Sequence, residues 1–294
     1  MEYRHKWMFS ALLIIVIGVG GLFAVLQTRK ASPRITHDAF TETVAVDAED
    51  AFIEVPVVIS IKNEVSDQGM HFTMNTEYPE IALAQHPTLA KEANDVITSF
   101  VESIKNDFKK NLAEISKEDV RDNLTSDLTM RFTPLLLSPT IISIRFDSSE
   151  YIAGALHPNN QVRILNYNIA KHLLLSPTDL FASSTQAVPF LSDYSRKALR
   201  ILFADMSEID FVAQTFPGTA PTAQNFQEVG ITKTGLSVFF SQYQVAPYAR
   251  GIPEVRIPLH DMSNVSSTDS LLSMDVSEAV RMASDNIVEA TPME

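Results

Sequence analysis

Alternating apolar residues predict two strands near the C-terminus. They fall at Leu236, Val238 and Phe240, and then at Val255, Ile257 and Leu259. A period of two places each set on one face of a strand, so the residues between them, Ser237 and Phe239 among them, belong to the opposite face. In the connection, Pro247 cannot donate to a β-ladder and Gly251 allows a positive φ. Residues 235–258 therefore predict two strands joined by a return.

The same reasoning predicts strands elsewhere, namely at residues 52–61, 71–78, 128–137, 140–146 and 162–169. Pro56 suggests an edge or a bulge in the first, and Pro79 ends the second. Apolar residues spaced by three or four predict helices over 89–112 and 191–203. Residues 211–218 are expected to be irregular, and a short helix over 271–288 stays open. The predicted class is α+β, a mostly antiparallel sheet with two main packed helices.

The N-terminus contains a long uncharged apolar segment. Residues 8–26 are apolar apart from Ser10, and at about 1.5 Å per residue they nearly cross a hydrocarbon core of about 30 Å. A cleaved signal peptide is the alternative, but its apolar core is about 7–15 residues long and a small-residue cleavage site follows it, which is missing before Arg29. We expect an uncleaved transmembrane helix. The flanking basic residues do not decide its orientation.

These elements divide the chain into five parts. We expect a cytoplasmic tip and transmembrane anchor at 1–30 and an acidic stalk at 31–51. An N-terminal α+β part at 52–127 and a C-terminal part at 128–262 form the folded body. An acidic, flexible tail occupies 263–294. The spacer composition of the stalk needs no function beyond separation.

Composition removes several classes of function. The 294 residues carry a formal net charge of −13 and no cysteine. The acidity argues against a nucleic-acid partner, and the lack of cysteine excludes disulfides, thiol catalysis and cysteine zinc sites. Six histidines beyond His5 stand without a second ligand at helical spacing: His37, His71, His86, His157, His172 and His260. No catalytic residue, metal site or cofactor is therefore predicted.

Residues near the C-terminus carry a resemblance to a known family. The matching positions are Gly235, Leu236, Phe240, Tyr243, Ala246, Pro247, Tyr248, Ala249, Gly251, Glu254, Val255, Ile257 and Pro258. They resemble the signature of a bacterial extracytoplasmic domain of unknown function, found in peptidoglycan deacetylases and in the lysozyme-sensing anti-sigma-V factor. The family's G-G-A-H turn is present only as Gly154-Ala155-Leu156-His157. The resemblance runs from about Val44 to Met262 and is strongest in the last third.

The resemblance implies a sensing or binding module outside the membrane. The deacetylase domain of some relatives and the sigma-binding domain of others have no counterpart in this sequence. We therefore expect a single-pass membrane protein with a cytoplasmic N-terminus, whose ectodomain binds peptidoglycan or a lysozyme-like protein. The alternative is a cell-wall glycan hydrolase or deacetylase-related enzyme with an unrecognised carboxylate site. A structural envelope protein without a ligand is a third interpretation.

Four residues are the candidate binding groups. Tyr243, Tyr248 and Arg250 lie in the connection between the two C-terminal strands, and Tyr and Arg are the usual anchors of interfaces. The alternative is that these tyrosines pack inward. His157 follows Gly154 on a turn between strands and either contacts a ligand or hydrogen-bonds the turn backbone.

Overall fold

The computed structural model describes residues 55–69, 71–114, 124–262 and 265. Within those ranges the chain is a mixed α+β protein with nine strands and three α-helices. The predicted anchor, stalk and 271–288 helix, and the tail apart from residue 265, lie outside the described residues. Among the residues that are described, none of the helices combines the length and the apolar character that a membrane crossing requires.

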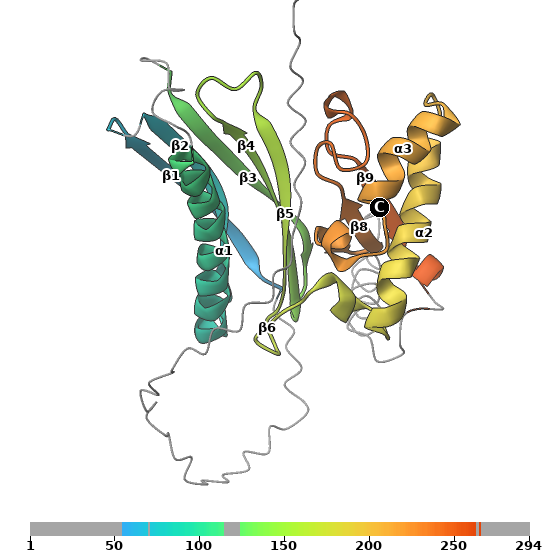
Figure 1. Cartoon of the computed structure of the whole chain (residues 1–294). Helices are drawn as coiled ribbons and strands as arrows, with labels where there is room; N and C mark the ends of the chain where they lie inside the picture. Colours follow the sequence, from blue (N-terminus) through green and yellow to red (C-terminus); the bar gives the residue numbers. More distant parts are fainter. Residues whose placement is uncertain (1–54, 70, 115–123, 263–264, 266–294) are drawn as a thin grey trace, which may run out of the picture. The chain divides into compact units, whose positions relative to one another are not determined.

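Six strands form the larger sheet, in the order β1-β2-β3-β4-β5-β6 (Figure 1). Their bounds are β1 Val57–Asp67, β2 Phe72–Ala82, β3 Ser126–Leu137, β4 Ile141–Tyr151, β5 Asn159–Asn168 and β6 Leu173–Leu174. All neighbours are antiparallel except β2 and β3, which run parallel. Parallel neighbours need a crossover, and helix α1 (Pro87–Ala113) supplies it.

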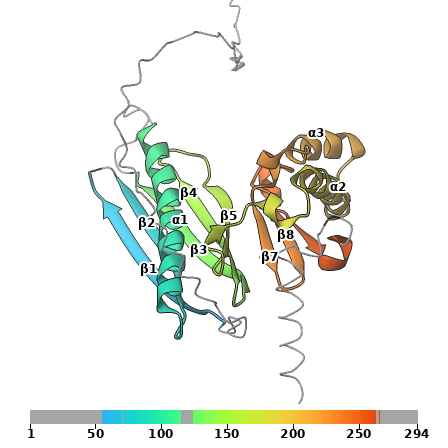
Figure 2. The ribbon, with the colours of Figure 1, turned by 90° about the horizontal axis from the view of Figure 1, so that it is seen from below.

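Helix α1 covers one face of this sheet (Figure 2). Its buried residues, which include Ala93, Ile97 and Val101, recur at three or four positions as the sequence predicts. Beyond the last β2–β3 pair, Thr76 with Met130, the Asn94 side chain accepts from the Ile81 N–H at 2.7 Å and donates to the Ile81 carbonyl at 2.9 Å. The helix thereby satisfies backbone groups that would otherwise lack a strand partner.

The smaller sheet consists of β7 Val229–Thr232, β8 Gly235–Phe239 and β9 Glu254–Pro258, all antiparallel. Two helices accompany it, α2 Ser184–Leu202 and α3 Glu208–Gly218, together with 3₁₀ turns at Pro177–Leu180, Ala223–Phe226, Tyr248–Arg250 and Leu259–Met262. Residues from all of these elements except the Tyr248–Arg250 turn form one apolar core, in which Leu199, Phe211, Val238 and Ile257 are buried.

Side chains of the larger sheet complete the edge of β7. Ser143 of β4 accepts from the Ile231 N–H at 3.0 Å, and Asn166 of β5 donates to the Val229 carbonyl at 2.7 Å. The Ser143 hydroxyl also donates to Asn166 at 2.7 Å. Ser143, Asn166, Val229 and Ile231 are all buried, and each of these polar groups has a hydrogen-bond partner. This polar junction therefore joins the two sheets.

The predicted strand pairs are largely confirmed. The strands at 128–137 and 140–146 pair antiparallel as β3 and β4, and the C-terminal pair forms β8 and β9. The predicted division at 127/128 falls inside β3, and the larger sheet extends on both sides of it.

Two predictions were wrong. Residues 211–218 belong to helix α3, so the described chain has three helices instead of two. Pro79 lies within β2 opposite Ser60 and does not end that strand. The alternation in β8 is confirmed as a strand, and the structure adds that the face carrying Ser237 and Phe239 is also buried, because it turns toward the larger sheet, where the Arg145 guanidinium lies 4.6 Å from the Phe239 ring centre. A half-exposed strand would alternate, whereas β8 is covered on both faces.

Candidate binding surface

Three of the four predicted site residues come together in space. His157 lies in the connection from β4 to β5, and Tyr243 and Tyr248 lie in the connection from β8 to β9. The ring centroids are 4.1 Å apart for His157 and Tyr248, 5.6 Å for the two tyrosines and 6.3 Å for His157 and Tyr243. We call these three residues the aromatic cluster. Aromatic rings at such separations attract one another and form a stable apolar surface.

Hydrogen bonds fix the orientation of the three rings. His157 Nδ1 lies 3.1 Å from the Pro158 carbonyl, which can only accept, so Nδ1 carries the proton. In the neutral imidazole, Nε2 then accepts from the Tyr243 hydroxyl at 3.2 Å. The Tyr248 hydroxyl donates to the same Pro158 carbonyl at 3.1 Å. The cluster thus anchors one connection to the other.

Exposure differs within the cluster. Tyr243 is 62% exposed, His157 is exposed and Tyr248 is partly buried. Tyr248 therefore acts as the support, while Tyr243 and His157 present their rings to solvent. His157 thus hydrogen-bonds the backbone of its own turn, as one alternative for that residue held. Tyr248 packs inward, as the alternative for the tyrosines held, whereas Tyr243 does not.

The β8–β9 connection that carries the tyrosines is held in place by hydrogen bonds of Gln244 and by close packing against Gly218. The Gln244 side chain accepts from the Ser241 N–H at 3.0 Å and donates to the carbonyls of Gly218 and Asn225 at 3.0 and 2.9 Å. A Cβ at Gly218 would lie 1.8 Å from the Gln244 carbonyl oxygen, so only glycine permits this approach. Tyr243 itself has a φ of +65°. This uncommon conformation for a bulky residue directs its ring outward.

Arg250 lies apart from the cluster. Its guanidinium pairs with Asp205 and lies 5.4 Å from the centre of the Phe203 ring, after the end of α2. The hydrogen bond from Arg250 is the largest cause that lowers the pKa of the Asp205 carboxyl. Arg250 therefore attaches the β8–β9 connection to the segment that follows α2.

Glu228 and Gln242 are two residues that hold β5 and that the sequence did not indicate. The Glu228 carboxylate accepts from the Ile164 N–H at 2.7 Å, and Gln242 accepts from the Asn160 N–H at 3.0 Å. Burial raises the pKa of the Glu228 carboxyl from 4.5 to about 7, against the opposing effects of the Ile164 bond and the nearby Arg163 charge. Both side chains bind backbone groups of β5. No local sequence signal marks such long-range partners.

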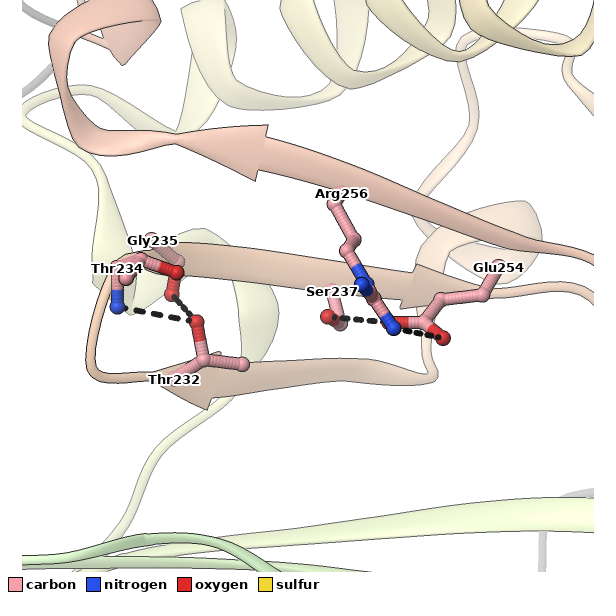
Figure 3. Close-up of polar contacts among 6 residues, drawn as sticks. All are labelled: Thr232, Thr234, Gly235, Ser237, Glu254 and Arg256. Atoms are coloured by element: carbon pink, nitrogen blue, oxygen red, sulfur yellow. Dashed lines mark hydrogen bonds and ion pairs between the residues drawn. The ribbon is translucent and has the colours of Figure 1, made fainter.

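A second polar group lies on the face of the smaller sheet (Figure 3). The Glu254 carboxylate accepts from Ser237 at 2.8 Å and from the Arg256 Nε at 2.8 Å. Burial opposes ionisation of Glu254, but the hydrogen bonds from Arg256 and Ser237 outweigh it and lower its pKa. Together with Leu135 of β3, these residues line a hollow of about 390 Å³. Glu254 is thus a fixed anion that cannot readily deliver a proton.

Metal ligands are not gathered anywhere in the part of the chain that the structure describes. There, no three His, Cys, Asp or Glu residues lie close enough together to hold a metal ion. A larger hollow of about 770 Å³ lies between β1, β2 and the start of α1, and its lining is mostly apolar apart from Glu80, Lys91, Asn94 and Thr98.

Comparison with known proteins supports the fold of the whole described body. A crystal structure of a DUF3298 family member from Bacteroides fragilis is similar, with a TM-score of 0.53, 16% identity, and coverage of 76% of this chain and 99% of that one. A DUF3298 family protein from Pseudomonas aeruginosa has a TM-score of 0.50, 13% identity, and coverage of 72% and 93%. At such identities the likeness concerns the fold alone. A search of curated proteins found no match.

The family model matches the region that carries the tyrosines. Residues 178–260 fit DUF3298, described as a protein of unknown function. The match starts at the 3₁₀ turn before α2 and ends after β9, so it spans the smaller sheet with both of its helices. Residues 178–260 of this chain thus form a DUF3298 domain.

Proposed function

We propose that this protein is a membrane-anchored binding or sensing module of the bacterial cell envelope, and that the aromatic cluster takes a saccharide of the cell wall. The observation that carries the proposal is the convergence of His157, Tyr243 and Tyr248 from two connections onto one surface. The membrane anchor is the apolar segment 8–26, and the body lies outside the membrane.

The chemistry of the cluster suits a sugar ring. The C–H groups on one face of a pyranose carry partial positive charge and pack against the negative face of an aromatic ring. Hydroxyls at the rim of the sugar find donors and acceptors in the Tyr243 hydroxyl and in Asn160, whose amide lies 3.4 Å from the Tyr248 hydroxyl. Since the connection is already rigid, little conformational entropy is lost on binding.

A basic protein of the lysozyme kind is the second candidate partner. The net charge of −13 would attract a cationic protein and increase its rate of association. Exposed tyrosines are also common anchors of protein interfaces. Salt distinguishes the two partners, because binding driven by net charge weakens as ionic strength rises, whereas stacking on a neutral sugar does not.

The hydrolase alternative gains no support from the described residues. Glycan hydrolysis needs a pair of carboxyls of which one is protonated. Glu254 is held as an anion by Arg256 and Ser237, and Glu228, although burial raises its pKa to about 7, is used as the hydrogen-bond acceptor of the Ile164 N–H. We therefore assign no catalytic role to either residue.

The test is binding by the full-length chain in detergent micelles, to insoluble peptidoglycan and to immobilised lysozyme. Tyr243→Ala should weaken binding to the true partner by about tenfold or more, as expected for an interface anchor. Leu156→Ala is the matched control, because Leu156 is fully exposed in the His157 turn and makes no ring contact in the cluster. Failure of the unaltered chain to bind either material would refute both partners.

The location of the body has its own test. Protease added to intact cells should digest the chain beyond Lys30 if the body lies outside the membrane. Full protection in intact cells, with digestion after lysis, would reverse the proposed orientation and place the body in the cytosol.

A further inference from the structure

The first strand of the larger sheet offers a long edge to solvent. β1 is 11 residues long and ends the sheet on the side away from β6 (Figure 1). Its side chains are mostly exposed, including Val57 at 62%, Ile59 at 49% and Val65 at 37%. Proteins usually shorten, bend or cover such an edge, because its backbone groups can pair with another strand. Here no described strand lies beyond β1.

The pairing with β2 shows which backbone groups of β1 point outward. Ser60 lies opposite Pro79, which has no N–H, so this pair occupies a non-hydrogen-bonded position of the ladder. In agreement, the Thr76 hydroxyl donates to the Asn63 carbonyl at 3.4 Å, which requires that carbonyl to face β2. The even-numbered residues of β1 therefore direct their N–H and C=O groups to the outer edge.

We propose that β1 pairs antiparallel with β1 of a second copy of this chain, centred on Asn63, and joins the two larger sheets into one. In this register Lys62 faces the partner's Glu64, and Glu64 faces the partner's Lys62. Ile61 faces the partner's Val65 on the other side of the sheet. The even-numbered residues pair with each other, so their outward backbone groups meet as an antiparallel ladder requires.

Charge selects this register. Shifting the centre to Lys62 would place the two Lys62 side chains opposite each other, and like charges in that position are destabilising. Centring on Asn63 instead places Lys62 between Glu77 of its own sheet, which lies opposite it in β2, and the partner's Glu64. Lys and Glu on an edge also protect against unspecific association. The same two residues therefore oppose other pairings and favour this one.

Cysteine cross-linking tests the contact directly, since the natural chain has no cysteine. At the centre, the two Asn63 Cα atoms would be about 4.5 Å apart in a non-hydrogen-bonded pair, within the range of about 4.4–6.8 Å that a disulfide spans. The full-length Asn63→Cys chain in detergent should form a disulfide-linked dimer under mild oxidation. Ser60→Cys is the matched control, because its two copies would lie about 20 Å apart.

Mixing variants tests the register. Ser60 would face the partner's Ser66, so a mixture of Ser60→Cys and Ser66→Cys chains should cross-link although neither does so alone. Cross-linking of Asn63→Cys no greater than that of Ser60→Cys alone would overturn the proposal. So would equal cross-linking of the mixed and separate Ser60→Cys and Ser66→Cys samples, because the register would then not hold.

Charge reversal provides an independent measurement, by sedimentation of the detergent-solubilised chain. Lys62→Glu or Glu64→Lys should weaken self-association by about an order of magnitude, because each brings two like-charge pairs together. The double variant Lys62→Glu/Glu64→Lys should restore it, and a mixture of the two single variants should form the heterodimer. Single reversals that associate as strongly as the natural chain would contradict the proposed pairing.

Discussion

The larger-sheet region (residues 57–174) and the smaller-sheet region (177–262) reach their folds by different means. In the first, five strands run 10 to 12 residues and one helix covers a face of the sheet. In the second, three strands of 4 or 5 residues lie among helices and turns. Repeated hydrophobic periodicity determines the first region. The second depends on single positions where only one residue type fits.

The match to the family model falls on the region that contains such single positions. The match to the DUF3298 model covers residues 178–260, which is the smaller-sheet region. That region contains Gly218 and Gly235, where a Cβ would lie 2.0 Å or less from a backbone oxygen of another segment. A periodic pattern can be written with many residues, whereas a close backbone approach admits only glycine.

Among the predictions that test this difference between the two regions, Gly235→Ala should cause the largest loss of stability. Gly235 has a φ of +150°, and its Cβ would lie 2.0 Å from the Ile257 carbonyl oxygen across the β8–β9 pair. The two strands cannot separate without breaking their ladder, so we expect a loss of about 3 kcal/mol or more in the free energy of unfolding. Denaturant unfolding of the full-length chain measures it.

Gly251→Ala is the matched control for this substitution. Gly251 also has a positive φ, +68°, but a Cβ there would meet nothing within 4 Å. The cost should be conformational strain alone, about 1–2 kcal/mol. Equal losses for the two alanine variants would show that the close approach at Gly235 relaxes easily, and would remove the distinction drawn between the two regions.

The next largest change in stability depends on pH and concerns Glu228, which links the two regions through its hydrogen bond to the Ile164 N–H. Burial raises the pKa of Glu228 to about 7 from 4.5. Between these values the folded chain binds more protons than the unfolded chain, so the contribution of Glu228 to stability is full below pH 4.5 and is lost as pH rises through 7. Glu228→Gln keeps an acceptor for the Ile164 N–H but does not titrate. The free energy of unfolding of Glu228→Gln, relative to that of the natural chain, should therefore increase by about 2 kcal/mol from pH 4 to pH 8.

A second carboxylate provides a control of opposite sign. The pKa of Glu254 is lowered by Arg256 and Ser237 despite its burial, so its contribution is present above the unfolded pKa and lost as pH falls. Glu254→Gln should therefore lose stability relative to the natural chain at neutral pH and less at low pH. Thermal unfolding of both variants at pH 4 and pH 8 distinguishes the two signs. Parallel changes in the two variants would contradict the environments assigned to these carboxylates.

Much of the larger-sheet region could be predicted from the sequence, because periodicity is a local signal. The positions of β3, β4 and α1 follow from the alternation and from the helical spacing of apolar residues. Pro79 misled the prediction because a proline at a non-hydrogen-bonded position costs the β1–β2 ladder no bond. The burial of Ser237 and Phe239 could not be predicted, because sequence alternation does not show whether the second face of β8 is also covered.

The candidate site was predictable residue by residue but not as a site. Tyr243 and Tyr248 were indicated by residue type and by their place in a connection. Their contacts with His157 join residues that are 86 and 91 positions apart in the sequence. No spacing rule reaches that far. Arg250 was grouped with the tyrosines by proximity in sequence, yet the 3₁₀ turn Tyr248–Arg250 directs it to Asp205.

The smallest effect, and the one that bears on the helix missed in the sequence, concerns the start of α3. Ser207 accepts from the Asp210 N–H at 3.1 Å and its hydroxyl donates to the Asp210 carboxylate at 2.7 Å, which is a local capping signal. Ser207→Ala should lower the free energy of unfolding by about 1 kcal/mol, read as a lower unfolding midpoint. Ser183→Ala is the control, because Ser183 starts α2 without a side-chain cap. An equal loss in both would show that the cap does not determine where α3 begins, and that the apolar face of Phe211 and its neighbours holds the helix instead.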